Sequence, residues 1–229
     1  MTPHTRKQAR KTFGRFDKLV FALVIAVQLA SVFSASAKSG PEILSEAREM
    51  IRAQNVSLTG KLRTGPRNVP FSLTQHDGVS TYVFRDPTET VTVSLGESGV
   101  KITGPESTAT PIRNSVLTYD DLALRFLYWT RIDDLGTEKL RSLPCWRLRL
   151  DAPNKTSPYA FVKLWVNQQS GAFLRAQAFD WNGALAKQFD VVSTQTIGGR
   201  YFLKSMKIQL LTPAPKGSET LSYLEIDKP

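Results

Sequence analysis

The stretch CWRLRLDAPNKTSPYAFVKLWVNQQSGAFLRAQAF, residues 145–179, decides the fold. It contains three short runs, 145–150, 161–166 and 173–179, in which apolar and polar residues alternate. Because successive side chains of a β-strand point to opposite faces, this alternation predicts strands with one buried and one solvated face. The residues between the runs include Pro, Asn, Ser and Gly, which favour turns. The stretch therefore predicts consecutive antiparallel strands.

One face of these runs is consistently apolar. Trp146, Leu148 and Leu150 share it, whereas the two arginines between them lie on the other face. The same pattern continues through Ala160, Val162, Leu164, Val166, Leu174, Ala176, Ala178, Met206, Ile208 and Leu210. A sheet built in this way predicts a half-barrel with an apolar interior. That interior is either a filled core or a ligand cavity.

Similar alternation extends along most of the remaining chain. Further strands are predicted at residues 56–63, 71–75, 80–84, 91–95, 100–103, 137–141, 184–193, 201–211 and 219–226. Turn signals separate them, among them Asp77-Gly78, Asn182-Gly183 and Gly198-Gly199. We therefore expect a mainly β (α+β) fold, a meander of about eleven or twelve antiparallel strands in one domain, residues 38–229. Such a sheet must curl, and its edges must be closed or covered.

Two helices are expected beside the strands. Residues 41–54 carry an apolar stripe of Ile43, Leu44, Ala47, Met50 and Ile51. A second helix, residues 122–129, follows a capping-box pattern at 118–121 and places Leu122, Ala123, Phe126 and Trp129 on one side. Two helices are too few to cover both faces of the sheet, but they can cover its concave face.

The first 37 residues have the features of a secretory signal peptide. A basic start is followed by the 15-residue apolar stretch 19–33 and by Ala35-Ser36-Ala37. This stretch is shorter than the roughly 20 residues that a membrane span requires. We expect cleavage between Ala37 and Lys38, which would give an exported, soluble periplasmic protein. An uncleaved N-terminal anchor is the alternative.

Charge and composition exclude several functions. The whole chain has a formal charge of +10, but residues 1–37 contribute half of that excess, so +5 remains. This balance gives no support for nucleic-acid binding. One cysteine and two histidines cannot form a disulfide framework or a Cys-rich metal site. We expect no cofactor and no metal.

Catalytic patterns are weak. The Asp120/Asp121 pair belongs to a predicted helix start and the Asp133/Asp134 pair to a predicted turn. His76 lies in a hairpin turn, and Cys145 is expected to be a small buried apolar residue. We therefore do not expect an enzyme.

Residues 118–226 resemble the LolA-like family of outer-membrane lipoprotein-sorting proteins. Several short pieces carry the resemblance in order, namely Leu143-Pro144-Cys145-Trp146-Arg147-Leu148, Ser157-Pro158-Tyr159-Ala160, Leu164-Trp165-Val166, Phe173-Leu174-Arg175, Phe179-Asp180-Trp181-Asn182-Gly183 with Lys187, and Ile197-Gly198-Gly199-Arg200-Tyr201. Residues 41–103 fit the family's opening helix and first hairpins in outline. The resemblance implies an unclosed antiparallel barrel, capped by helices, with a cavity that accepts acyl chains.

The resemblance also implies a function. Carriers of this kind move lipoproteins or lipids across the periplasm, so we expect an acyl-chain carrier or binder. Its expected partners are acyl chains of lipoproteins or lipids and membrane-bound donor and acceptor proteins. We expect a monomer. In the family an arginine holds the helical lid, and Arg52, Arg63 and Arg125 are candidates for it here. The alternative is a non-enzymatic envelope sensor module that binds a protein partner on the same fold.

The expected ligand contacts come from the two helices and the apolar strand face. They are Leu44, Ala47, Met50, Ile51, Leu122, Phe126, Trp129, Trp146, Leu148, Leu150, Val162, Leu164, Leu174, Ala176, Met206 and Ile208.

Overall fold

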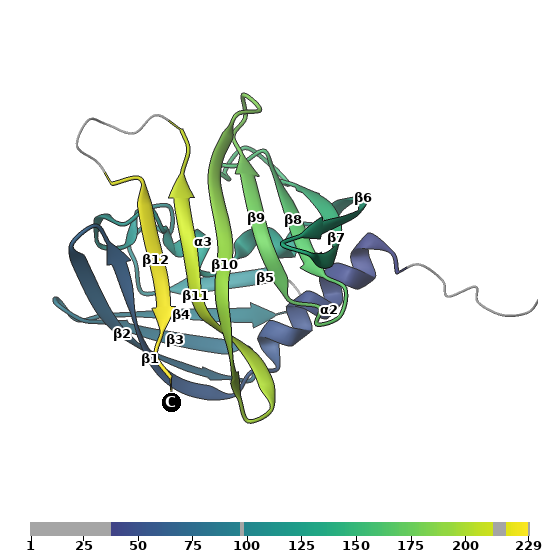
Figure 1. Cartoon of the computed structure of the whole chain (residues 1–229). Coiled ribbons are helices and arrows are strands. Elements are labelled where there is room, and N and C mark those ends of the chain that lie inside the picture. Colours follow the sequence, from purple (N-terminus) through teal and green to yellow (C-terminus); the bar gives the residue numbers. More distant parts are fainter. Residues whose placement is uncertain (1–37, 97–98, 213–218, 229) are drawn as a thin grey trace, which may run out of the picture. The chain divides into compact units, whose positions relative to one another are not determined.

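The computed structural model describes residues 38–96, 99–212 and 219–228 (Figure 1). Residues 38–229 form one compact unit. The predicted signal peptide, residues 1–37, lies outside the described residues. Within the described ranges, no helix combines the length and apolarity needed to cross a bilayer.

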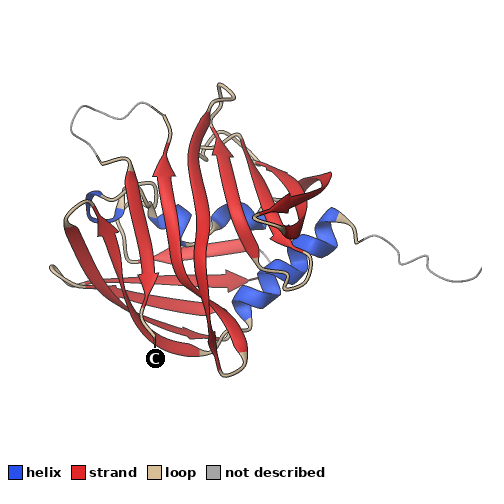
Figure 2. Ribbon diagram, viewed as in Figure 1, coloured by secondary structure: helices blue, strands red, loops and turns tan. Residues whose placement is uncertain are grey.

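Within the described residues, twelve strands form a single antiparallel sheet, which Figure 2 shows in red. They are β1 (Val56–Thr64), β2 (Arg67–His76), β3 (Val79–Phe84), β4 (Glu89–Gly96), β5 (Gly99–Thr103), β6 (Arg131–Leu140), β7 (Leu143–Asp151), β8 (Phe161–Asn167), β9 (Phe173–Phe179), β10 (Leu185–Ile197), β11 (Arg200–Leu210) and β12 (Leu221–Ile226). Their order is β5-β4-β3-β2-β1-β12-β11-β10-β9-β8-β7-β6, so β5 and β6 are the two edges and do not pair. The predicted unclosed antiparallel sheet is confirmed.

The helical segments lie along the open side of this sheet. Helix α2 (Gly40–Arg52) begins at a capping box formed by Ser39 and Glu42. It contacts edge strand β6, whereas the short 3-10 helix η2 (Arg125–Tyr128) contacts edge strand β5. Figure 1 shows β10–β12 crossing in front of β3–β5, with α2 and α3 (Tyr119–Leu122) on the inner side of the curled sheet. The helical segments therefore cover the sheet's inner face where its edges fail to meet.

The single helix predicted over residues 122–129 is wrong. Thr118 and Asp121 do form the predicted capping box, but α3 ends at Leu122 and η2 starts at Arg125. Between them Leu124 adopts a left-handed conformation with φ of 48°. The break has a packing explanation, because a straight helix has one apolar face. A broken one can bury Leu122, Ala123, Phe126, Leu127 and Trp129 together.

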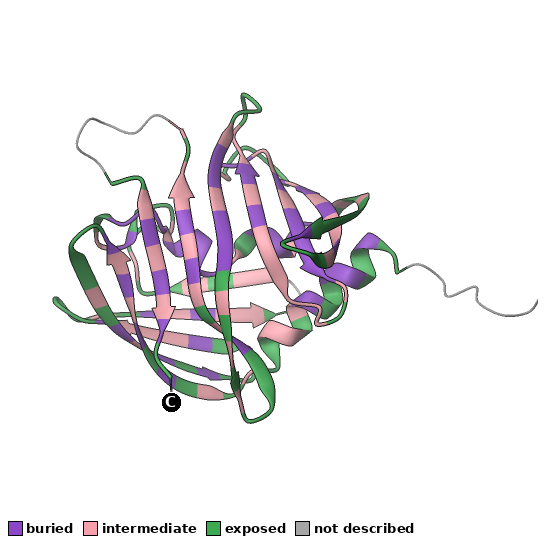
Figure 3. Ribbon diagram, viewed as in Figure 1, coloured by how far each residue is buried: buried purple, intermediate pink, exposed green. Residues whose placement is uncertain are grey.

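The apolar strand face predicted from the alternation is buried in one core. Figure 3 shows buried and less buried residues alternating along the strands. Leu148, Leu150, Val162, Leu164 and Ala176 have no exposed surface, and Ile43 and Leu44 of α2 join them in the same core. The predicted inward face of β7, β8 and the second half of β9 is therefore confirmed.

Two local predictions fail because strands bulge. Leu174 was expected on the inner face, but the β8–β9 register moves from Trp165↔Arg175 to Val166↔Phe173, which leaves Leu174 unpaired in a bulge. Beyond the bulge the faces exchange, so Leu174 packs outside. The Asp133/Asp134 pair lies inside β6 and not in a turn. The β6–β7 register shifts between Asp134 and Thr137, which places a second bulge there.

Candidate functional site

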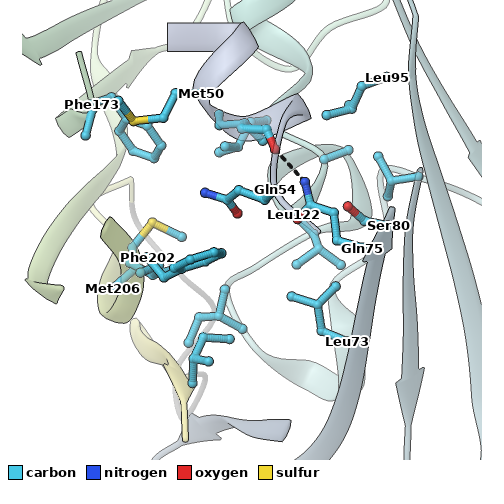
Figure 4. Close-up of a pocket in the computed structure, with 18 of the residues that line it drawn as sticks. Met50, Gln54, Leu73, Gln75, Ser80, Leu95, Leu122, Phe173, Phe202 and Met206 are labelled. Carbon is cyan, nitrogen blue, oxygen red and sulfur yellow. Dashed lines mark hydrogen bonds between the residues drawn. The ribbon is translucent and has the colours of Figure 1, made fainter. Parts of the chain in front are cut away.

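A cavity of about 190 Å³ lies between the inner face of the sheet and the helical segments. Its helical wall comes from the second half of α2 and from residues 122–128. Its sheet wall comes from β1–β4 and β9–β12, with Leu73 of β2 and Met206 of β11 on opposite sides (Figure 4). Tyr201, which is 64% exposed, also lines the cavity and therefore marks its mouth. The cavity occupies one half of the interior only.

The wall is mostly apolar, and no residue in the described part of the chain that lines it is charged. Both methionines that follow residue 37, Met50 and Met206, line it. Methionine side chains are flexible and polarizable, so they adapt to ligands of irregular shape. Burial raises the pKa of Tyr82 to about 12, which keeps this phenol neutral at physiological pH. Such a cavity can hold a neutral, largely hydrocarbon group.

Five of the sixteen residues expected to contact a ligand line this cavity. They are Ala47, Met50, Ile51, Leu122 and Met206. The other eleven lie elsewhere: Leu44, Phe126, Trp129, Trp146, Leu148, Leu150, Val162, Leu164, Leu174, Ala176 and Ile208. Whether any of these side chains touches a ligand stays a prediction.

Most of the eleven pack in the filled half of the core. Phe126, for example, packs against Phe189, with their ring centroids 6.0 Å apart. Trp146 is half-buried at the margin of this core, and Lys38 lies over its ring. Leu174 packs outside the sheet with Leu140, Cys145 and Trp165. Alternation identifies an inward face, but it cannot say where that face meets filled or empty space.

Several cavity residues were not predicted. Phe173 lines the cavity because the β9 bulge turns it inward in place of Leu174. The wall from β1–β4, including Leu58, Leu73 and Val93, was predicted as strand but not assigned to the site. The alternation in those strands was the signal that could have identified them.

An unpredicted arginine joins the two helical segments. Arg48 of α2 donates to the Leu127 carbonyl at 2.5 Å and to the Trp129 carbonyl at 3.3 Å. Its guanidinium also lies over the Tyr128 ring, 5.1 Å from the centroid. Partial burial lowers the pKa of Arg48. These contacts hold α2 against η2, and residues of both segments line the cavity.

The three arginines suggested by the resemblance make other contacts. Arg52 pairs with Glu49 on the exposed side of α2. Arg63 pairs with Glu225. Arg125 pairs with Asp120 within residues 118–129, the segment that contains α3 and η2 and is called the helical insert below. None of the three links one helical segment to the other among the contacts of the described residues.

The helical insert is fixed at its other end by a buried ion pair. Asp121 accepts from Lys187 Nζ at 2.6 Å and from the Tyr159 hydroxyl at 2.9 Å, and it also accepts from the Thr118 backbone N–H. Asp121 is 1% and Lys187 5% exposed. Burial raises the pKa of Tyr159 well above its ordinary value, and the Asp121 charge adds to this. Only the capping role of Asp121 could be predicted from sequence.

The weak catalytic candidates lie apart from the cavity. His76 is exposed at the end of β2 beside Asp77, and Cys145 is fully buried as predicted. Among the described residues, no cluster of His, Cys, Asp and Glu has the geometry of a metal site.

The open twelve-stranded sheet with helices over its inner face is the fold of LolA-type proteins, and solved structures confirm this. A domain assigned to outer membrane lipoprotein sorting from Vibrio parahaemolyticus has a TM-score of 0.62 and 14% identity, covering 83% of this chain and 92% of that chain. A LolA superfamily protein from Nitrosomonas europaea has a TM-score of 0.59 and 16% identity, covering 84% and 93%. A DUF1329 family protein from Desulfovibrio piger has a TM-score of 0.56 and 14% identity, covering 83% and 92%.

The sequence itself matches a family model. The model of a family described as "Uncharacterized protein" matches residues 98–228, more than half of the chain. The chain belongs to that family. Comparison with curated proteins gave no match.

Proposed function

We propose that this protein is a periplasmic binder or carrier of acyl chains that acts in lipoprotein sorting or in lipid transfer to the outer membrane. The observation that carries the proposal is the apolar cavity of about 190 Å³ in a LolA-type fold. Burying hydrocarbon is favourable by about 0.8 kcal/mol per CH₂, so binding requires no elaborate polar motif. The proposal assigns no catalytic step to any residue.

The cavity size indicates that binding involves movement. An engineered apolar cavity of about 150 Å³ binds benzene, whereas pockets for drug-sized ligands span roughly 300–1,000 Å³. The closed cavity therefore accommodates part of an acyl chain. The full chain requires the second half of α2, which carries Met50 and Ile51, to move outward.

Arg48 is suited to control that movement. Its donors hold two backbone carbonyls of the insert, Leu127 and Trp129, so releasing them would let α2 separate from η2. The insert would remain in place because Asp121 anchors it through Lys187 and Tyr159. We infer that α2 is the moving part of the lid and the insert is the fixed part.

The location and partners complete the proposal. Residues 1–37 would direct export and be removed after Ala37, which releases the protein into the periplasm. A carrier then requires membrane-bound donor and acceptor proteins, and we propose that it meets them as a monomer. The sensor module that binds a protein partner is the competing proposal on the same fold.

Native mass spectrometry of protein purified gently from a periplasmic extract tests the proposal. We expect bound lipid or acylated peptide that is released on denaturation. The control is the same protein after removal of lipid, incubated again with phospholipid and with a triacylated peptide. A clean ligand-free mass in both experiments contradicts the carrier and favours the partner-binding module.

A further inference from the structure

Three uncharged polar side chains lie close together in the cavity wall. Gln75 of β2 and Ser80 of β3 are directly opposite each other in the antiparallel ladder, and both line the cavity. Gln54, which follows α2, extends its amide into the same cavity (Figure 4). Gln75 is 5% exposed and Ser80 is 6% exposed. Donors and acceptors are thus buried inside an otherwise hydrocarbon-like space.

Only part of their hydrogen-bonding capacity is used within the protein. Gln75 Nε2 donates to the Ile51 carbonyl at 2.5 Å, which fixes the end of α2 to β2. The hydrogen bond drawn in Figure 4 is that of Gln75, and none is drawn from the side chain of Ser80 or Gln54 to the other residues shown. The side chains of Ser80 and Gln54 line the cavity, so a ligand carbonyl oxygen within reach would accept a hydrogen bond from their donors.

Among the described residues, the cavity wall contains no counter-ion for a charged ligand. In the part of the chain that the structure describes, no Lys, Arg, His, Asp or Glu lines the cavity. The titratable residues that line it are tyrosines, and burial raises the pKa of Tyr82 and Tyr128. An ionised carboxylate would therefore enter without a counter-ion, which is strongly unfavourable.

We propose that the cavity selects acyl chains joined to a neutral carbonyl, as an ester or an amide, over free fatty acids. Ser80 and Gln54 donate hydrogen bonds to that carbonyl, while Gln75 holds the end of α2 beside it. The remainder of the ligand leaves through the mouth at Tyr201. This inference rests on the proposed binding of acyl chains and adds the chemistry of the chain's polar end.

Displacement of a neutral fluorescent probe tests the selectivity. The full chain is expressed in a bacterial host, recovered from the periplasmic extract, delipidated and loaded with N-phenyl-1-naphthylamine. Decane, methyl decanoate, decanamide and decanoate then compete at pH 8. We expect the ester and the amide to bind at least about tenfold more tightly than decanoate, because only decanoate is charged.

The outcomes separate this inference from the proposed function. If the probe and decane bind but methyl decanoate competes no better than decanoate, the selectivity is overturned and acyl-chain binding stands. If neither the probe nor decane binds, the proposed function itself fails.

Substitutions assign the selectivity to residues. Ser80→Ala should weaken methyl decanoate binding about fivefold and leave decane unaffected, since one hydrogen bond is lost. Ser72→Ala is the matched control, because Ser72 lies between Phe71 and Leu73 and faces the other side of β2. Gln54→Leu tests the second donor independently of Gln75, whose loss would also release α2. Equal ester affinity in all three variants and the original protein would overturn the assigned roles.

Two lipid sources carry such carbonyls, and direct competition distinguishes them. A triacylated peptide offers both ester and amide carbonyls, whereas a diacyl phospholipid offers esters only. Native mass spectrometry of the delipidated protein with equal amounts of each shows which source is retained. Retention of either supports the inference, and retention of free fatty acid in preference to both contradicts it.

Discussion

The two halves of the curled sheet enclose different interiors. Under β7–β9 the space is filled by side chains without exposed surface, such as Leu148, Leu164 and Ala176. Under β1–β4 and β11–β12 the inward residues, such as Leu73 and Val93, border a cavity. Both halves have the same alternating pattern. The difference arises from what covers them.

Helix α2 shows how one element serves both halves. Its first half carries Ile43 and Leu44, which are fully buried in the filled core. Gly40 lies so close to Ile132 and Leu148 that a Cβ there would be 3.0 Å and 3.4 Å from their side chains. Its second half carries Met50 and Ile51, which are partly exposed and face the cavity. The first half of α2 is therefore packed into the core, and the second half borders the cavity.

The largest effect on stability is expected at the buried ion pair between Asp121 and Lys187, which fixes the helical insert to β10. Asp121→Ala leaves Lys187 buried without its counter-ion and removes the Tyr159 and Thr118 contacts. Breaking a buried ion pair costs about 3–5 kcal/mol, so the free energy of unfolding should fall by about 4 kcal/mol. Guanidinium chloride denaturation measures it. Asp120→Ala is the matched control, and its pair with half-exposed Arg125 predicts a loss near 1 kcal/mol. Equal losses would show that the buried pair is not the anchor.

Truncating a leucine to alanine should cost more stability in the filled half of the interior than beside the cavity. Leu164→Ala removes a fully buried side chain from a close-packed core, which should cost about 3 kcal/mol or more. Leu73→Ala enlarges a cavity that already exists and should cost roughly 2 kcal/mol, because fewer neighbours lose contacts. Denaturant midpoints with unchanged slopes give both values. A larger loss for Leu73→Ala would reverse the assignment of filled and empty halves.

Enlarging a valine to phenylalanine should also distinguish the two halves, because the filled half has no room for the larger side chain and the cavity has. Val162→Phe overpacks the filled half and should destabilise by about 2 kcal/mol. Val93→Phe points into the cavity, so it should change stability by less than about 1 kcal/mol and abolish binding of the fluorescent probe. Thermal unfolding and probe titration are measured on the same samples. If the probe still binds fully to Val93→Phe, its site lies elsewhere.

The sequence predicts the sheet well because strand alternation is a local signal. The strands, the inward face of Leu148 and Leu164, and the capping box at Thr118 all follow from residues close in sequence. The errors arise where a tertiary contact changes a local pattern. Bulges turned Leu174 outward and kept Asp133 in a strand, and packing broke the second helix at Leu124.

The site was less predictable than the sheet for the same physical reason. A cavity is space left over after packing, and it depends on how α2 and the insert meet the sheet. Arg48 lies outside the apolar stripe of its helix, and nothing near it in sequence indicates Leu127 as its partner. The sequence likewise contains no local sign that Lys187 would reach Asp121.

A small change in stability should accompany a clear change in dynamics at the end of α2. Arg48→Met retains an apolar stem but removes the hydrogen bonds to the Leu127 and Trp129 carbonyls. Arg48 is partly exposed, so the loss of unfolding free energy should be about 1 kcal/mol. Hydrogen exchange should nevertheless accelerate in the second half of α2 and not in α3, which Asp121 still anchors.

Arg52→Met is the matched control, since its ion pair with Glu49 stays within α2. If exchange in α2 is unchanged by Arg48→Met, or rises equally in both variants, Arg48 does not hold the lid. The different stability of the two ends of α2 would then depend on the packing of Ile43 and Leu44 at one end and on the Gln75 hydrogen bond to Ile51 at the other.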